Sequence, residues 1–223
     1  VDKVIDAGIM VTVHCNGGLG YASTPDLSVD GMKRAFQRAK EWAENTAENS
    51  VVDTAKLELP HLVGNYKTPV QRPWNTVPLN EKLEILKDID ARLPSDERIV
   101  DWSCSLMSIQ KSALYITNQG GYIQQELEML APDMMVIANQ GAITQKRSFG
   151  SRGVSQQGGM EILDRVGFLD AAEQISAEAI QLLEAPDCPS GKMDLILMAD
   201  QMMLQIHESI GHPLELDRIL GDE

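Results

Sequence analysis

Residues 97–150 constrain the fold most, because strand-like segments alternate there with turn residues. Val100, Trp102, Cys104 and Leu106 alternate with polar neighbours, which is the two-residue period of a half-buried strand. Further β-rich segments, separated by turn sequences at 118–121, 131–133 and 139–141, lie at 114–117, 122–127, 134–138 and 143–149. Short connections make successive strands antiparallel neighbours, so this region predicts an antiparallel meander.

Helical patterns flank the meander on both sides. After a cap at Asp26 or Ser28, residues up to about 48 carry a stripe of mostly small apolar side chains at helical spacing: Met32, Ala35, Phe36, Ala39, Ala43 and Ala47. Such a stripe predicts a helix that approaches a sheet or another helix closely. Further helices are predicted at 78–93, 160–166, 168–184 and from about 200 onward.

The remaining segments are predicted to be strands, turns and connections. Ile9–His14 is β-branched and predicts a strand, which Gly17, Gly18 and Gly20 should end in a sharp turn or bulge. The proline-rich stretch 59–78 predicts a long connection or extended arm, and 150–159 predicts a flexible loop. Asp194–Ala199 predicts a short strand. The next helix should bury three apolar side chains, those of Met202, Met203 and Ile206.

Together these patterns predict an α+β fold, an antiparallel β meander flanked by helices. We expect one domain over 1–223, with a strand-helix-arm-helix region at 1–93, the meander at 97–150 and a helical region at 158–223.

Composition excludes some classes of function. A net charge of −14 and a pI near 4.6 disfavour a nucleic-acid or anionic-membrane surface, which would need clustered Lys and Arg. Cys15, Cys104 and Cys188 are scattered without C-x-x-C spacing, so we expect a reducing compartment, with the cytoplasm as the default. No apolar run reaches the length of about 18 residues that a membrane span needs.

The candidate chemistry lies near the end of the chain, in His207-Glu208-Ser209-Ile210-Gly211-His212. Imidazoles are favoured zinc ligands, and a glutamate that does not bind the ion can act as general base for an attacking water. The common H-E-x-x-H motif places its histidines at i and i+4 on one helix face. Here the spacing is i and i+5, which leaves the two rings roughly 140° apart on a regular helix.

Two local features could bring the histidines together. Gly211 tolerates backbone angles that distort a helix, and Pro213 biases His212 away from the α region. A π-type bulge would also absorb one extra residue, and such bulges favour functional sites. We therefore expect His207 and Glu208 on a helix, with His212 brought into register by a break or widened turn at Gly211. The alternative is a His-Glu pair that is simply solvated at an exposed helix end.

The stretch from His207 through Glu208 and His212 to Gly221 resembles the signature of the TldD/PmbA family of metalloproteases, on the TldD side. The segment Gly17–Leu27 is similar to the glycine-rich strand and turn that precede a long helix in that family. The resemblance implies a zinc-dependent peptidase in which His207 and His212 are metal ligands and Glu208 is the general base. It also implies a third ligand, a cysteine in a C-terminal domain, and none of the three cysteines here matches that position.

The resemblance implies more about context. We expect this chain to be the N-terminal part of a TldD-like protein, a fragment without the C-terminal domain. The expected partners are a peptide or unfolded-segment substrate and a second related subunit, in a homodimer or heterodimer. Either Glu215 or Asp217 could accept the second ring N–H of a ligating histidine, and a solvated surface role is equally open to both.

Two rival functions remain open from the sequence. One is a non-catalytic partner or regulatory subunit with a vestigial metal motif, which the absence of zinc would identify. The other is a metal-dependent hydrolase acting on a non-peptide amide, which substrate tests would separate from a peptidase. His14 and His61 have no apparent partner in the sequence and receive no role.

Overall fold

The structure is a computed structural model that describes residues 2–50, 53–56, 61–150 and 153–221. The chain divides into two compact units, the first formed by Val1–Pro60 with Leu195–Glu223 and the second by His61–Asp194. Both contain antiparallel strands, and helices pack on them, so the predicted α+β class is confirmed. Within the described ranges, no helix is long and apolar enough to cross a membrane.

The first unit begins with a β-hairpin of β1 (Ile9–Cys15) and β2 (Gly18–Thr24). Asn16 and Gly17 connect the strands, with φ values of 49° and 84°, the positive angles that a two-residue hairpin turn requires. The prediction that three glycines end the first strand is therefore only partly right. Gly17 lies in the turn, whereas Gly18 and Gly20 lie inside β2, with their α-carbons facing the next helix.

Helix α1 (Val29–Thr46) packs on this hairpin through small residues. The Ser28 side chain caps the helix by accepting a hydrogen bond from the Gly31 N–H at 3.1 Å. A Cβ added at Gly20 would lie 2.1 Å from the Ala39 carbonyl oxygen. The close approach predicted from the alanine stripe is thus confirmed, because both surfaces lack bulky side chains where they meet.

The two large side chains of the predicted stripe do not share this burial. Met32 and Phe36 are 37% and 51% exposed, whereas Ala35, Ala39 and Ala43 are buried. A two-stranded sheet is narrow, so it covers only the central row of α1 and leaves the flanking side chains in solvent.

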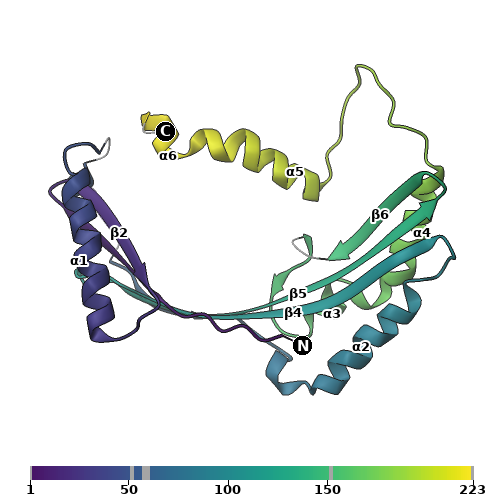
Figure 1. Cartoon of the computed structure of the whole chain (residues 1–223), viewed down its shortest axis with the longest axis horizontal. Helices are drawn as coiled ribbons and strands as arrows, with labels where there is room; N and C mark the ends of the chain where they lie inside the picture. Colours follow the sequence, from purple (N-terminus) through teal and green to yellow (C-terminus); the bar gives the residue numbers. More distant parts are fainter. Residues whose placement is uncertain (1, 51–52, 57–60, 151–152, 222–223) are drawn as a thin grey trace. The chain divides into compact units, whose positions relative to one another are not determined.

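The second unit is built around one long strand, β5 (Tyr122–Gln140). One edge of β5 pairs antiparallel with β4 (Ile99–Ile116). The opposite edge of β5 pairs, from its beginning to its end, with β3 (Val63–Lys67, parallel), β7 (Gln156–Gln157) and β6 (Ile143–Gly150). Figure 1 shows β4 and β5 as the two long strands of this sheet, with α2 and α4 on one side of it.

The long strands correct two predictions. The sequence 131–133 does not turn, because Pro132 continues β5 and pairs with Leu106. Pro132 lies between the segments of β5 that pair with β7 and with β6, and a missing N–H is tolerated where a ladder is interrupted. The predicted connection 59–78 contains a strand, β3, and a short turn. Residues 59–60 of that stretch, like 151–152 of the predicted loop, lie outside the described residues.

Three helices cover the buried face of this sheet, namely α2 (Leu79–Arg92), α3 (Ile162–Arg165) and α4 (Ala172–Glu184). Short 3₁₀ turns accompany them at η2 (Trp74–Thr76) and η4 (Phe168–Asp170), and another, η1 (Thr54–Lys56), lies in the first unit. The core is aliphatic around one aromatic ring; its largest fully buried side chains include Phe168, Ile89, Leu93, Leu130, Met134 and Met160.

The last part of the chain is a run of consecutive helical segments. Helix α5 (Ala199–Ile206) leads into a π-helical turn, η5 (His207–Gly211), then a 3₁₀ turn, η6 (His212–Leu214), and finally α6 (Leu216–Leu220). The predicted strand at Asp194–Ala199 is wrong, since residues 193–198 form no strand and Ala199 is already helical. No described segment pairs with this stretch, and an unpaired strand is not stable by itself.

Candidate metal centre

The candidate site lies where the helix geometry changes at the end of α5. His207 and Glu208 are the first two residues of η5, and His212 is the first residue after it. The His212 N–H donates to the His207 carbonyl oxygen. This i to i+5 hydrogen bond is the defining bond of a π turn, and it joins the two histidines of the motif directly.

The widened turn solves the problem posed by the five-residue spacing. The two imidazole rings lie with their centroids 4.5 Å apart and meet edge to face at 71°, whereas a regular α-helix would turn them roughly 140° away from each other. The predicted widened turn is therefore confirmed, and the extra residue of the motif is the one that the π turn accommodates.

The means by which the turn forms differ from the prediction. Gly211 has φ and ψ of −59° and −59°, and His212 has −61° and −45°, so both residues are in the right-handed helical region. Pro213 does not displace His212 from the α region, and Gly211 uses no angle that is special to glycine. The widening comes from the hydrogen-bond pattern and not from a break in the chain.

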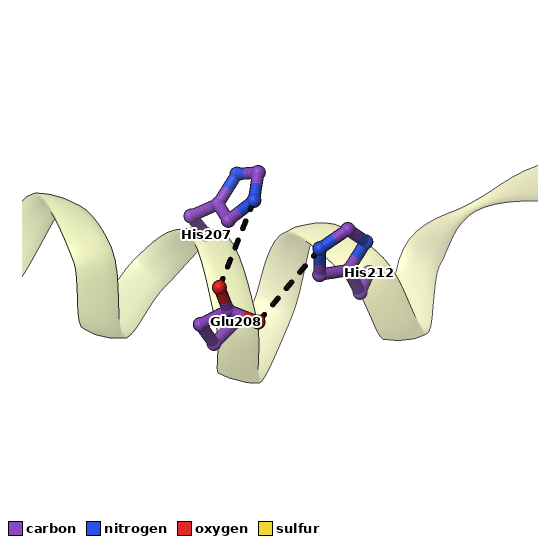
Figure 2. A group of neighbouring side chains, drawn as sticks. All are labelled: His207, Glu208 and His212. Atoms are coloured by element: carbon purple, nitrogen blue, oxygen red, sulfur yellow. Dashed lines mark ion pairs between the residues drawn. The ribbon is translucent and has the colours of Figure 1, made fainter.

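The three side chains of the motif converge on one point, as Figure 2 shows. Glu208 lies between the rings, with one carboxylate oxygen 3.9 Å from His207 Nε2 and the other 3.7 Å from His212 Nε2. The potential ligand atoms of the three residues all lie within 4.8 Å of one another. The Nε2 atoms of both histidines therefore face the same small volume.

His212 is held on its other side as well. Its Nδ1 lies 2.8 Å from Glu215 Oε1, and Glu215 Oε2 lies 3.2 Å from Arg218 Nε. The sequence left Glu215 and Asp217 as equal candidates for this contact, and the structure places Glu215 there. The Asp217 carboxylate instead accepts a hydrogen bond from the backbone N–H of Arg218.

Arg218 received no role from the sequence. Its spacing of three residues from Glu215 at a helix start is a signal that could have identified it, because side chains at i and i+3 are neighbours on a helix. The signal was weak, since it becomes informative only once Glu215 is known to contact His212.

The donor set fits a divalent transition metal. Two imidazoles and a carboxylate are ligands or neighbours typical of zinc sites. Nitrogens that bind one ion at about 2.1 Å can lie at most about 4.2 Å apart, so the observed cluster needs only a small side-chain rotation to hold an ion. Among the residues that the structure describes, this is the only group of three potential ligands that meets this test of proximity. It includes no cysteine, and neither His14 nor His61 belongs to it.

The helix behind the histidines is more exposed than the sequence predicts. Met202, Met203 and Ile206 are 40%, 60% and 47% exposed, so the prediction that they are buried is wrong. The main contacts of α5 are with its own continuation, η5. An amphipathic pattern signals burial only where another element covers the apolar face, and none of the described elements does so here.

A surface hollow of this chain lies elsewhere. It has a volume of about 500 Å³ and is lined by residues of β2 and α1, including Tyr21, Arg38 and Trp42. No residue of the histidine motif lines it. The candidate ligands therefore lie outside this hollow, on an exposed helical segment.

Two family models match the sequence. One, described as PmbA/TldA metallopeptidase domain 1, matches residues 1–43, and the other, described as the PmbA/TldA metallopeptidase central domain, matches residues 72–183. The second alone covers half of the chain. The histidine motif lies outside both matched ranges, so the matches and the site geometry are independent observations.

Curated relatives share the sequence over nearly the whole chain. A metalloprotease of Methanocaldococcus jannaschii is 25% identical over 97% of this chain and 47% of its own length. A metalloprotease of Methanothermobacter thermautotrophicus is 29% identical over 97% of this chain and 46% of its own length. A TldD homolog of Haemophilus influenzae is 22% identical. The chain thus spans just under half the length of these relatives.

Solved structures share the fold. A protein of Thermotoga maritima described as a modulator of DNA gyrase aligns with a TM-score of 0.53 at 16% identity, over 82% of this chain and 39% of its own. A protein of Bacteroides thetaiotaomicron with the same description aligns with a TM-score of 0.55 at 15% identity, over 80% of this chain and 39% of its own.

Proposed function

Because the chain belongs to the TldD/PmbA family of metallopeptidases, we propose that it contributes two metal ligands and the general base to a zinc-dependent enzyme that hydrolyses peptide bonds. The observation that carries this proposal is the π turn, which directs the Nε2 atoms of His207 and His212 to the same carboxylate. A turn of this rare type has no evident packing purpose on an exposed helix, whereas π turns are frequent at functional sites.

His207 and His212 would hold the ion through Nε2. A bound Zn²⁺ supplies a Lewis acid that polarises the scissile carbonyl and makes a water molecule more acidic. Two protein ligands do not complete a catalytic zinc site, which has three. The third ligand is expected from the resemblance to be a cysteine outside this chain.

Glu208 would serve as the general base. Its carboxylate lies within 4 Å of both Nε2 atoms, so it is adjacent to the point where an attacking water would be held. There it can accept a proton from that water and later deliver the proton to the nitrogen of the leaving amine. Because the backbone of η5 fixes Glu208 next to His207, no other segment is needed to bring the base to the ligands.

A second candidate is a non-catalytic partner subunit with a vestigial motif. One observation favours it, namely that the His207 and Glu208 side chains are 60% and 58% exposed, whereas catalysis benefits from a site that excludes water. The main proposal also includes the two partners that the resemblance implies, namely a peptide substrate and a related second subunit. An enzyme confined to non-peptide amides would be identified by substrate tests.

Zinc stoichiometry in the intact native protein tests the ligand assignment. We expect about one zinc per chain, the number that one site holds, and its loss in the double variant His207→Ala/His212→Ala. His14→Ala is the matched control, because it removes an exposed histidine that belongs to no ligand group. Zinc retained in the double variant, or absent from the protein when zinc is supplied during growth, would contradict the proposal.

The general-base role needs a separate variant. Glu208→Gln keeps the size of the side chain and removes its basicity, so zinc should be retained while peptide hydrolysis falls by about 10²–10⁴-fold. If hydrolysis persists undiminished with zinc bound, Glu208 is not the base. If the zinc-loaded parent hydrolyses no peptide, the vestigial-subunit alternative gains support.

A further inference from the structure

The two histidines of the site are not equivalent in their surroundings. His212 has a partner at each ring nitrogen, Glu208 near Nε2 and Glu215 at Nδ1. His207 has Glu208 near Nε2, and among the described residues no partner is recorded for its Nδ1. The His207 side chain is 60% exposed and that of His212 is 34% exposed. One ring is therefore oriented from both sides and the other from only one.

The contact at 2.8 Å determines which nitrogen of His212 carries the proton. An ionised carboxylate only accepts hydrogen bonds, so the Nδ1 of a neutral His212 must be the donor. The lone pair is then on Nε2, the atom that faces Glu208 and His207. A histidine that ligates a metal commonly donates its other ring N–H to a carboxylate, which fixes the tautomer and the ring orientation.

The backbone presents Glu215 to His212. Between the two residues runs the 3₁₀ turn η6, in which the Glu215 N–H donates to the His212 carbonyl oxygen at 3.1 Å. Side chains at i and i+3 of a 3₁₀ turn lie directly above one another. Glu215 also occupies the cap position of α6, but its side chain makes no capping hydrogen bond there. Its carboxylate is turned toward the imidazole instead.

Arg218 holds the second oxygen of the same carboxylate. Its Nε lies 3.2 Å from Glu215 Oε2, and a hydrogen-bonded guanidinium restricts the rotation of the carboxylate that it contacts. The chain of contacts Arg218–Glu215–His212 thus ends at the ring nitrogen opposite the candidate metal position.

We propose that Glu215, held by Arg218, is the positioning residue of this metal centre. It locks His212 as the Nδ1–H tautomer with Nε2 directed at the ion, which makes His212 the preorganised ligand and His207 the ligand that adjusts. This inference rests on the proposed function, because it concerns the same metal ligands.

The first test uses the metal-free chain and does not depend on activity. In ¹⁵N-labelled protein, at a pH well above the ordinary imidazole pKa, His212 should show the Nδ1–H tautomer, and Glu215→Ala should shift it toward the Nε2–H form that predominates in free imidazole side chains. Asp217→Asn is the matched control, since it alters a carboxylate in the same short helix that does not contact His212. An unchanged tautomer in Glu215→Ala would overturn the proposal.

The second test measures zinc affinity in the intact protein by competition with a chelator. Loss of an outer partner of a ligating histidine typically weakens metal binding by about 10–100-fold, which is the decrease we expect for Glu215→Ala. Glu215→Gln should recover part of the affinity, because an amide oxygen can still accept from Nδ1 but carries no charge. Asp217→Asn should bind zinc like the parent.

The outcomes separate this inference from the proposed function. Zinc lost in His207→Ala/His212→Ala but bound with parental affinity in Glu215→Ala would leave the metal site standing and overturn the positioning role. Zinc bound equally by all variants would overturn both. An equal loss of affinity in Glu215→Ala and Asp217→Asn would assign the effect to α6 as a whole and would also overturn the specific role of Glu215.

Discussion

The second unit, residues 61–194, and the C-terminal helical run, residues 195–220, contain similar apolar side chains, but these form a buried core only in the second unit. In the unit formed by 61–194, apolar residues of the sheet and of α2, α3 and α4 form one buried core around Phe168. In the run from 195 to 220, large apolar side chains are exposed, including those of Leu195, Ile196, Met203, Leu204, Ile210, Leu214, Leu216 and Ile219. We infer that the conformation of residues 61–194 depends on the packing of buried side chains, and that of the helical run on contacts between its polar residues.

This difference in burial predicts which substitutions should change folding stability and which should change metal affinity. The free energy of unfolding of the second unit depends on the volume and shape of its buried side chains, because its interior is close-packed. The conformation of the helical run depends on backbone hydrogen bonds and on a few polar contacts among His207, Glu208, His212 and Glu215. Stability and metal affinity should therefore respond to separate sets of residues.

The largest expected contrast pairs Phe168→Ala with Met203→Ala. Phe168 is fully buried, and its truncation should lower the free energy of unfolding by about 3–5 kcal/mol. Met203 is 60% exposed, so its truncation should change that free energy by no more than about 0.5 kcal/mol. Denaturant unfolding of the same chain measures both. Similar losses in the two variants would show that Met203 is buried in solution and would remove the contrast.

A smaller contrast pairs two glycines. Gly20→Ala would place a Cβ 2.1 Å from the Ala39 carbonyl oxygen, and forcing α1 away from β2 should cost about 1–3 kcal/mol. At Gly211 the nearest atom to an added Cβ is the Ile206 carbonyl oxygen at 3.8 Å, and the backbone is helical. Gly211→Ala should therefore stabilise the helical run by up to about 1 kcal/mol.

Circular dichroism and zinc titration of these two variants sharpen the comparison. Gly20→Ala should reduce thermal stability without changing zinc affinity, and Gly211→Ala should preserve both the helix and zinc binding. A loss of zinc in Gly211→Ala would mean that the π turn needs glycine after all.

The smallest expected effect is a loss of folding stability at acidic pH, which comes from one ion pair in the second unit. Hydrogen bonds from the Arg98 side chain and backbone lower the pKa of Asp96 from 3.8 to about 2. Because the folded-state pKa is depressed, the stabilisation from this pair is present above about pH 4 and is lost as the pH falls toward 2. Unfolding measured across that window should show a shallower decline in Asp96→Asn than in the parent. Parallel curves would exclude the pair as a source of acid sensitivity.

Local patterns in the sequence predicted much of the secondary structure. The Ser28 cap and the alanine row of α1, the helix that begins after Pro78 and the turn at 118–121 all follow from interactions within a few residues. The turn predicted at 139–141 lies at 141–142, because Asn139 and Gln140 still pair within the sheet. The π turn was also foreseeable, because two imidazoles five residues apart can share an ion only if a helix is widened or broken. These features depend on local backbone geometry, which a sequence reports directly.

Local patterns could not predict strand pairing between residues that are far apart in the sequence. Pro132 and its neighbours have the composition of a turn, yet the partner strands on either side of β5 keep them extended. Val63–Lys67 lies in a proline-rich stretch and becomes a strand only because β5 offers a parallel edge. Asp194–Ala199 has strand composition and finds no partner among the described residues.

By itself, the sequence predicted the α+β class, proposed His207 and His212 as candidate metal ligands beside Glu208, and required an irregular helix if both histidines are to face one ion. The tertiary structure decided that the irregularity is a π turn with ordinary helical angles, that Glu215 and not Asp217 faces His212, and that α5 is exposed. The reason is that residue type and spacing limit which chemistry can occur, whereas the choice between equivalent side chains depends on atoms brought together by folding.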